Sequence, residues 1–257
     1  MSKSEQKILY VTAGGDAPYA LANHIYRTHP NLIIAREKVQ SKAAITYSRA
    51  RSKGWLKALG QLGTMVFSRM GKSVFFRVYK REISERNLDV KLDRNIDIVD
   101  ISTPNSSEFI DLVKTLKPNI IFLSGCRIIS QETLTEIDIP ILNYHAGINP
   151  KYRGMFGGYW SRRNGDVDNY GTTVHLVDAG VDTGDILYQS IIPIKGHETM
   201  LTDAIIQVTH SMDISLRAID DVCNNKIVVK DVNIPSQLWF QPTLWSYIWC
   251  GITKNIW

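Results

Sequence analysis

The sequence predicts an α/β fold: an open, mostly parallel, twisted sheet flanked by helices. Over the first 145 residues or so, short apolar runs alternate with segments of helical periodicity. The run at 119–124 is continuously apolar, as expected of a strand covered on both faces. Hydrophobic residues make up 44% of the chain and charged residues 21%, which supports a sizeable core and excludes wholesale disorder.

The elements follow from these patterns. The expected strands are short apolar runs bounded by turn residues, at 7–11, 32–35, 96–101, 119–124, 139–143, 171–178 and 186–194. The expected helices carry apolar residues at helical spacing, at 19–26, 107–116, 131–137 and 202–223. Ser107 is the candidate cap of the second helix. The strands at 171–178 and 186–194 are close enough in sequence to pair antiparallel, which makes the expected sheet Rossmann-like with a mixed edge.

The chain divides into one large unit and a tail. We expect a domain over 1–225 with a basic helical insertion at about 36–90, and a short aromatic tail over 226–257. Four of the six Trp lie in the tail. We favour an aromatic strap that packs on the body, with a dimer interface or a membrane-interface belt as alternatives. No signal peptide or membrane-spanning stretch is visible, so we expect a cytoplasmic protein without stable membrane insertion.

The positive charge is concentrated in the insertion. Residues 36–86 contain 13 Lys and Arg against three acids, whereas the whole chain carries only +5. The favoured interpretation is a solvated basic face on amphipathic helices. The alternatives are a wall that attracts a polyanionic substrate such as a nucleotide, or a weak membrane-surface contact. We expect no nucleic-acid partner, because no recognised binding motif accompanies the charge.

Candidate catalytic side chains follow two of the later strands. Asn143 and His145 lie two residues apart at the end of an expected strand, so they face the same side. Asp182 lies in the loop after the next strand. An amide can donate to an oxyanion, an imidazole can transfer protons, and a neighbouring carboxylate raises the pKa of the imidazole and orients it. Taken singly, each residue is also compatible with a structural histidine or a turn aspartate.

The motifs together are more specific than any one alone. Asn143-Tyr144-His145, Pro150 to Gly154 and Asp182-Thr183-Gly184 occur in an order and spacing that resembles the formyltransferases that use 10-formyltetrahydrofolate. That family includes glycinamide ribonucleotide transformylase, methionyl-tRNA formyltransferase and the sugar N-formyltransferases. The stretch 120–129 also resembles its folate-binding segment.

The resemblance implies direct acyl transfer through a tetrahedral intermediate. Asn143 would bind the oxyanion, His145, protonated or sharing a proton, would stabilise that charge and manage proton transfer, and Asp182 would poise His145. It implies no covalent nucleophile, and the three widely spaced Cys and six His show no metal-ligand or disulfide pattern, so no metal is expected. The expected contacts to the folate formyl donor are Arg127, Ile128, Ile129, Asp178 and Val181.

The acceptor amine is less constrained. Methionyl-tRNA formyltransferases carry a long C-terminal domain, and about 35 residues follow Cys223. Glycinamide ribonucleotide enzymes bind phosphate at a Gly-rich first turn, where this chain has the acid Asp16. The Tyr159-Trp160 pair is similar to the sugar N-formyltransferases and can stack on a sugar or base.

We therefore expect a nucleotide-linked amino sugar as the small-molecule substrate, its product feeding surface polysaccharide synthesis such as O-antigen. A 4-amino-4,6-dideoxyhexose on a nucleoside diphosphate is one example. Formyl transfer to glycinamide ribonucleotide and a non-catalytic folate- or nucleotide-binding module remain alternatives, and a homodimer is left open. The candidate substrate contacts are Gly14, Gly15, Lys151, Arg153, Tyr159 and Trp160, with Arg162 as a further diphosphate contact.

Overall fold

A seven-stranded sheet organises the chain in the computed structural model, which describes residues 2–74 and 76–257. The strand order is β3-β2-β1-β4-β5-β7-β8, and the first five strands in this order run parallel. β7 and β8 pair antiparallel at one edge, so the predicted fold class is confirmed. The strands are β1 (Ile8–Thr12), β2 (Leu32–Glu37), β3 (Asp97–Ile101), β4 (Ile120–Leu123), β5 (Ile141–His145), β7 (Gly171–Leu176) and β8 (Ile186–Ile191).

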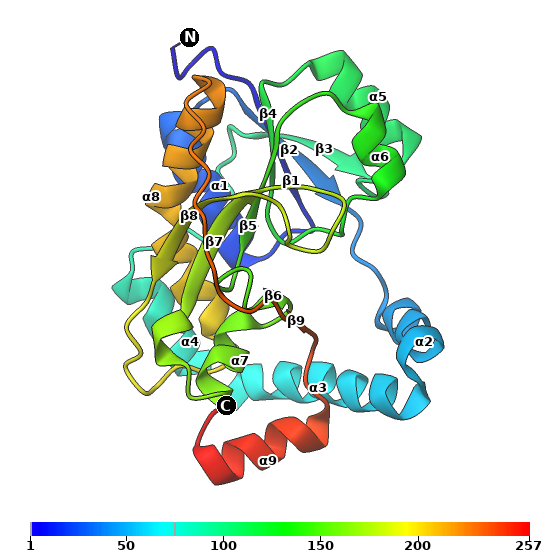
Figure 1. The fold of residues 1–257 in the computed structure, drawn as a ribbon, viewed down its shortest axis with the longest axis vertical. Coiled ribbons are helices and arrows are strands. Elements are labelled where there is room, and N and C mark those ends of the chain that lie inside the picture. Colours follow the sequence, from blue (N-terminus) through cyan, green and yellow to red (C-terminus); the bar gives the residue numbers. More distant parts are fainter. Residues whose placement is uncertain (1, 75) are drawn as a thin grey trace.

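Helices cover both faces of this sheet (Figure 1). α1 (Asp16–Thr28) and α8 (Asp203–Cys223) pack on one face, and α5 (Ser107–Leu116) and α6 (Gln131–Glu136) pack on the other. The cap of α5 is Ser106, whose hydroxyl accepts from the backbone N–H of Phe109, so the expected capping by Ser107 is wrong. Ser106 has the extended backbone that a cap requires, whereas Ser107 already lies in the helix.

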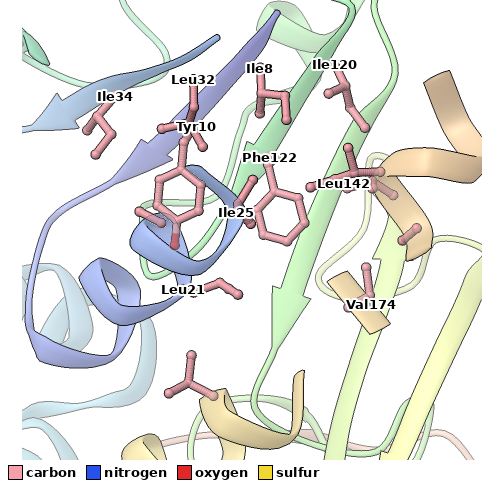
Figure 2. Packing of buried hydrophobic residues seen from close by; sticks show 14 of the residues in the cluster. Ile8, Tyr10, Leu21, Ile25, Leu32, Ile34, Ile120, Phe122, Leu142 and Val174 are labelled. Atoms are coloured by element: carbon pink, nitrogen blue, oxygen red, sulfur yellow. The ribbon is translucent and has the colours of Figure 1, made fainter. Parts of the chain in front are cut away.

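Two apolar cores result from the alternation of side chains along the strands. In β1, Ile8 and Tyr10 enter the core beneath α1 and α8, while Leu9 and Val11 enter the core beneath α5. Figure 2 shows the first of these cores, in which the ring of Tyr10 stacks on that of Phe122 with centroids 5.7 Å apart. Buried side chains therefore pack against both faces of the sheet, including the strands β4 and β5.

The basic insertion forms three helices: α2 (Lys42–Lys53), α3 (Trp55–Val74) and α4 (Phe76–Glu85). Ser41 caps α2 by accepting from the N–H of Ala44, and Gly54 ends it with a φ of 85°, which favours glycine. α9 (Leu244–Lys254) runs beside α3 because Gly60 and Gly63 leave room for its side chains. None of the described helices is long and apolar enough to cross a membrane.

Short elements connect the insertion and tail to the sheet. The tail strand β9 (Leu238–Trp239) pairs in parallel with β6 (Arg153–Gly154) in a separate two-stranded sheet. α7 (Gly157–Arg163) and a 3-10 turn (Val167–Asn169) lead from there into β7. Within the tail, Tyr247, Cys250 and Trp257 pack against Tyr159 and Met200. The tail thus touches the loop that follows the predicted catalytic strand.

Replacing Phe122 by Ala tests how far the sheet depends on this core. Phe122 is fully buried, so its loss leaves a cavity in the central strand, and the free energy of unfolding should fall by about 3–5 kcal/mol in urea titrations. The control is Val228→Ala, since Val228 is 77% exposed, and it should stay within about 0.5 kcal/mol of wild type. Equal losses of unfolding free energy in the two variants would contradict the placement of Phe122 in the core.

Candidate active site

The three predicted catalytic residues meet at the carboxyl end of β5. Asn143 and His145 come from alternate positions of β5, and Asp182 comes from the loop between β7 and β8. Because β7 runs antiparallel to β5, the loop after β7 leaves the sheet beside Ile141 and Leu142, and it folds back so that Asp182 reaches Asn143 and His145. Residues 39 positions apart in sequence are thereby brought into hydrogen-bonding range.

The carboxylate of Asp182 is the centre of the cluster. One oxygen accepts from the side-chain amide of Asn143 at 3.2 Å. The other lies 3.3 Å from Nδ1 of His145 and accepts from the backbone N–H of Gly154 at 2.8 Å. Asp182 has a φ of 50°, a left-handed conformation that is uncommon for residues other than glycine. The loop adopts this conformation where the carboxylate points back into the protein.

His175 is a fourth member that the sequence analysis missed. Its Nε2 lies 3.1 Å from the side-chain nitrogen of Asn143 and 3.5 Å from Asp182, and its Nδ1 lies 2.7 Å from the carbonyl oxygen of Leu176. Donation from Nδ1 to Leu176 leaves Nε2 free to accept from Asn143. His175 lies directly opposite Asn143 in the pairing of β5 with β7. Local sequence patterns do not reveal which residues of two strands pair, so the sequence alone did not indicate His175.

Both ring nitrogens of His145 face oxygen atoms. Nε2 lies 2.7 Å from the carbonyl oxygen of Tyr152, and Nδ1 faces Asp182. Burial lowers the pKa of His145 below its usual value, and the opposing effects of Asp182 and the Tyr152 carbonyl do not restore it. The neighbouring carboxylate raises the pKa as expected from the sequence, but the loss of hydration is larger. The resting ring is therefore neutral at neutral pH, and not protonated.

Asp182 remains ionised despite its burial. Burial alone would raise the pKa of this carboxylate. The adjacent His145 ring, the nearby His175 ring and the hydrogen bond from the Gly154 N–H outweigh that effect and hold the pKa well below its usual range. The site thus combines a fixed negative charge with a neutral imidazole that can accept a proton.

The region of the chain that contains this cluster matches a known protein family. The profile of the formyl transferase family matches residues 71–213, which include all four residues of the cluster. The chain belongs to the formyl transferase family. A methionyl-tRNA formyltransferase from Clostridium novyi is 34% identical over 113 residues, which is 43% of this chain and 36% of that protein. The chain therefore spans about a third of the length of this curated relative.

Solved structures share the fold of this chain. A sugar N-formyltransferase from a Shewanella strain superposes with a TM-score of 0.57 at 15% identity, over 91% of this chain and 76% of that one. Glycinamide ribonucleotide transformylase 1 from Symbiobacterium toebii gives a TM-score of 0.56 at 18% identity, over 88% and 91% of the two chains. At these identities the likeness establishes the fold alone.

One cavity lies between α6, the start of β5 and the loop that carries Asp182. Its volume is about 510 Å³, and Leu134, Ile141 and Val177 give it apolar walls. Asp178, one of the predicted folate contacts, lies on its rim. Val181 lies in the same loop, where its carbonyl oxygen accepts from Nη1 of Arg153 at 2.9 Å.

The other predicted folate contacts are placed differently. Arg127 turns away from the cavity, because its backbone N–H and Nε both donate to the buried carboxylate of Glu37, at 2.9 and 2.7 Å. Ile128 is 61% exposed, and its carbonyl oxygen accepts from Asn105. Ile129 is buried in the core beneath the cavity. Their roles toward a folate stay predictions.

A second cavity of about 590 Å³ lies between α1, the insertion, the segment after Gly154 and the tail. Met155 and Phe156 line it directly after Gly154, whose N–H binds Asp182. Asp16 lines it at the start of α1, next to the predicted substrate contacts Gly14 and Gly15. Side chains from the insertion, the loop before α8 and the tail complete its walls: Lys42, Ile45, Arg49, Met65, Phe67, Met200, Leu201, Gln241 and Tyr247.

Arg49 is the unusual member of this second cavity. Its guanidinium donates to Oε1 of Gln241 at 2.7 Å and contacts the sulfur of Met155 at 3.6 Å. Among the described residues it forms no ion pair with a carboxylate. Burial lowers the pKa of Arg49, yet an arginine stays charged in proteins. A half-buried cation without an anionic partner thus lines the cavity, and the sequence analysis did not single it out.

The remaining predicted substrate contacts make internal bonds. Lys151 pairs with Asp166 at 2.6 Å, and the ring nitrogen of Trp160 donates to the Phe240 carbonyl while its ring stacks on Trp239. Tyr159 is fully buried among core side chains, so its ring is not open to a ligand. Arg162 is also buried and pairs with Asp203 at 2.7 Å, which makes the expected diphosphate contact wrong in this conformation.

The charge of Asp182 predicts a pH-dependent contribution to stability. Its folded pKa lies below the unfolded value of about 3.9, so the contribution is fully present above that pH and is lost as the pH falls through the folded pKa. Asp182→Asn should therefore lower the free energy of unfolding by about 2 kcal/mol at pH 7, and this deficit should shrink in acid. Urea titrations of both proteins between pH 7 and about pH 3 measure it.

The matched control is Asp178→Asn in the same loop. Asp178 is exposed and accepts only from Gly180 and Thr183 of that loop, so its replacement should stay within about 0.5 kcal/mol of wild type across the range. A deficit for Asp182→Asn that does not change with pH would show that its carboxylate is not held in the charged form by the fold.

Proposed function

We propose that this protein transfers the formyl group of 10-formyltetrahydrofolate to the amine of a nucleotide-linked amino sugar. The observation that carries the proposal is the convergence of Asn143, His145 and Asp182 in one hydrogen-bonded cluster. Segments that adjoin this cluster in the chain line two cavities. The formyl donor supplies an activated acyl carbon when it is bound. A transfer needs one place for the donor and another for the acceptor, and we assign one cavity to each.

The catalytic residues have complementary tasks. As the amine attacks, negative charge develops on the formyl oxygen, and an N–H donor there lowers the barrier. Asn143 supplies that donor by exchanging its bond to Asp182, the longer of its two, while His175 keeps the other amide hydrogen in place. The bond to His175 therefore holds the amide in position, while the bond to Asp182 is the one exchanged for a bond to the formyl oxygen.

Proton transfer belongs to His145 and Asp182. One proton must move from the acceptor nitrogen to the departing nitrogen of the donor, so the reaction neither gains nor loses a proton overall. Nε2 of the neutral His145 ring donates to the Tyr152 carbonyl oxygen, so the ring accepts a proton at Nδ1, where the Asp182 carboxylate stabilises the charge that forms. Asp182 is not consumed in this scheme, because the protein holds it in the ionised form.

The first cavity suits the donor. A pterin ring is flat and carries donors and acceptors on its edge, so it is bound by apolar walls with exposed backbone groups along one side. Ile141 and Val177 provide such walls, and the 178–184 loop provides the backbone edge next to Asp182. No group of three or more His, Cys, Asp or Glu side chains in the described residues has the arrangement of a metal site.

The second cavity suits an acceptor that carries both an amine and an anionic group. Asp16 presents a carboxylate on one wall, where it accepts from the hydroxyl of Tyr79 at 2.7 Å. Arg49 and Lys42 supply cations from the insertion. A nucleoside diphosphate neutralises the half-buried Arg49 by the paired hydrogen bonds that guanidinium groups form with phosphate oxygens. The apolar remainder of the walls favours a deoxygenated hexose over a fully hydroxylated one.

Two other acceptors of the family are the competing candidates. Glycinamide ribonucleotide carries a phosphate that would have to bind near Gly14 and Gly15, where the Asp16 carboxylate repels it. Methionyl-tRNA is the substrate named for the curated relatives, which share about a third of their length with this chain. A panel of purified acceptors tests all three with 10-formyltetrahydrofolate as donor. Turnover with glycinamide ribonucleotide or methionyl-tRNA alone would end the sugar hypothesis.

Substitution of the catalytic residues tests the chemistry itself. Asn143→Ala should lower kcat by about 10²–10³, the loss typical of one oxyanion donor, and His145→Ala should lower it at least as far. The rate is followed by release of tetrahydrofolate with the best acceptor of the panel. Asn224→Ala is the control, because Asn224 is exposed at the end of α8 and its side chain donates to the Asp220 carbonyl oxygen instead of to a residue of the cluster. An active His145→Ala protein would refute the assigned mechanism.

Arg49→Gln tests the anionic acceptor. Loss of the guanidinium should raise KM for a nucleotide-linked acceptor at least tenfold and leave kcat nearly unchanged, because Arg49 binds the part of the substrate that does not react. Arg51→Gln is the matched control, since Arg51 lies on the same helix but is exposed and does not line the cavity. Equal KM values for the two variants would exclude Arg49 from acceptor binding.

A further inference from the structure

A second feature of the insertion and tail lies outside both cavities. On α3 and α9, large apolar side chains point to solvent instead of into the core. We call this surface the α3–α9 face. Its members are each between 44% and 76% exposed: Trp55, Leu56, Leu59 and Val66 on α3, and Trp245, Trp249 and Ile252 on α9.

These side chains form one surface and not scattered exposures. Trp245, Trp249 and Ile252 occur at i, i+4 and i+7, so they share one side of α9. The ring of Trp245 lies against Gly60 of α3, and the same ring lines a surface hollow of about 490 Å³ with Trp55 and Leu56. Figure 1 shows α3 and α9 side by side at the end of the molecule opposite α5.

The charge of this surface has a single sign. From residue 38 to residue 81 the chain has 11 Lys and Arg and no Asp or Glu, and no acid follows Asp231. Lys53 and Lys57 line the hollow beside Trp55, and no carboxylate does. Partial burial and the nearby cations Lys57 and Arg49 lower the pKa of Lys53 to about 8. These cations are thus crowded together without anions from the described part of the chain.

We propose that the α3–α9 face binds the surface of a bilayer that contains anionic lipids. Tryptophan rings and aliphatic side chains enter the boundary between headgroups and acyl chains, and lysines beside them attract anionic headgroups. The contact is peripheral, since none of the described helices can span a membrane. This inference does not depend on the proposed formyl transfer.

A second copy of the chain is a poorer occupant of this face. A symmetric dimer places the same patch of each subunit against the other. The Lys53 and Lys57 side chains of both subunits would then lie in one interface, and no acid among the described residues lines the hollow to offset their charge. A lipid surface supplies the missing negative charge and accommodates the protruding Trp249 and Ile252, which are 68% and 72% exposed.

The position of the face connects it with the second cavity. Met65 and Phe67 of α3 and Tyr247 of α9 line that cavity, while the α3–α9 face lies on other sides of the same helices. Binding to a bilayer therefore places the second cavity about one helix diameter, roughly 10 Å, from the lipid surface.

The experiment measures vesicle binding by the full chain. Wild type should co-sediment with vesicles of phosphatidylcholine and phosphatidylglycerol at about 50 mM salt, and the binding should weaken at least tenfold at about 500 mM as screening increases. Vesicles of phosphatidylcholine alone should bind at least tenfold more weakly. Binding should also shift the tryptophan emission to shorter wavelengths and expose it to quenching by brominated lipids. Failure to bind anionic vesicles at low salt would overturn the proposal.

Variants assign the binding to this face. The double variant Trp249→Ser/Ile252→Ser should bind anionic vesicles at least tenfold more weakly, and Lys53→Gln/Lys57→Gln should reduce the dependence on anionic lipid. Val228→Ser is the matched control, because Val228 is 77% exposed and lies outside the face, and its binding should equal that of wild type. Thermal unfolding followed by circular dichroism verifies that each variant is folded.

Two results would overturn the assignment to lipid. Equal vesicle binding by wild type and the Trp249→Ser/Ile252→Ser variant would place the contact elsewhere. A dimeric wild type that this variant converts to a monomer in sedimentation analysis, without vesicle binding by either, would show that a second copy covers the face.

Discussion

The carboxylate of Asp182 is the interaction on which the site depends. A buried carboxylate is costly unless polar groups surround it. This one accepts hydrogen bonds from a side-chain amide and a backbone N–H, and it faces the Nδ1 atom of an imidazole. These groups come from β5 and from β6, so the same contacts that stabilise the charge fix the positions of three separate segments. The left-handed backbone at Asp182 turns the carboxylate toward these groups. The contacts that stabilise the buried charge of Asp182 thereby also position Asn143 and His145.

The sequence predicted those parts of the site that local patterns determine. The two-residue period of a strand was enough to place Asn143 and His145 on one side of β5. The motif spacing was enough to pair them with Asp182. His175 was missed because its role depends on the register between β5 and β7, a long-range property. Tyr159 was assigned to substrate because the Tyr159-Trp160 pair is similar to the sugar N-formyltransferases. In the structure Tyr159 is fully buried against Tyr247 of the tail, a long-range contact that the local sequence does not show.

The protonation state of His145 shows why charge is harder to predict than position. From the sequence, a nearby carboxylate argues for a protonated ring. In the structure the ring is 6% exposed, and the loss of hydration lowers its pKa by more than the carboxylate raises it. Burial is a property of the whole fold, so no local pattern carries it. A neutral ring beside an ionised carboxylate suits a reaction in which a proton is received and then passed on.

The insertion and the tail behave as one structural unit because glycine permits it. A Cβ at Gly60 would lie 2.3 Å from the Trp245 ring, so the close approach of α3 and α9 requires a residue without a side chain there. The cations of this unit find few partners inside the protein: Glu82 pairs with Arg86, while Arg49, Lys53 and Lys57 have no ion pair among the described residues. Such an excess repels itself and lowers stability unless something outside neutralises it. A phosphate in the second cavity and anionic lipid at the α3–α9 face would do so at two different sides of the same helices, which connects the unusual charge of the insertion to both substrate binding and location.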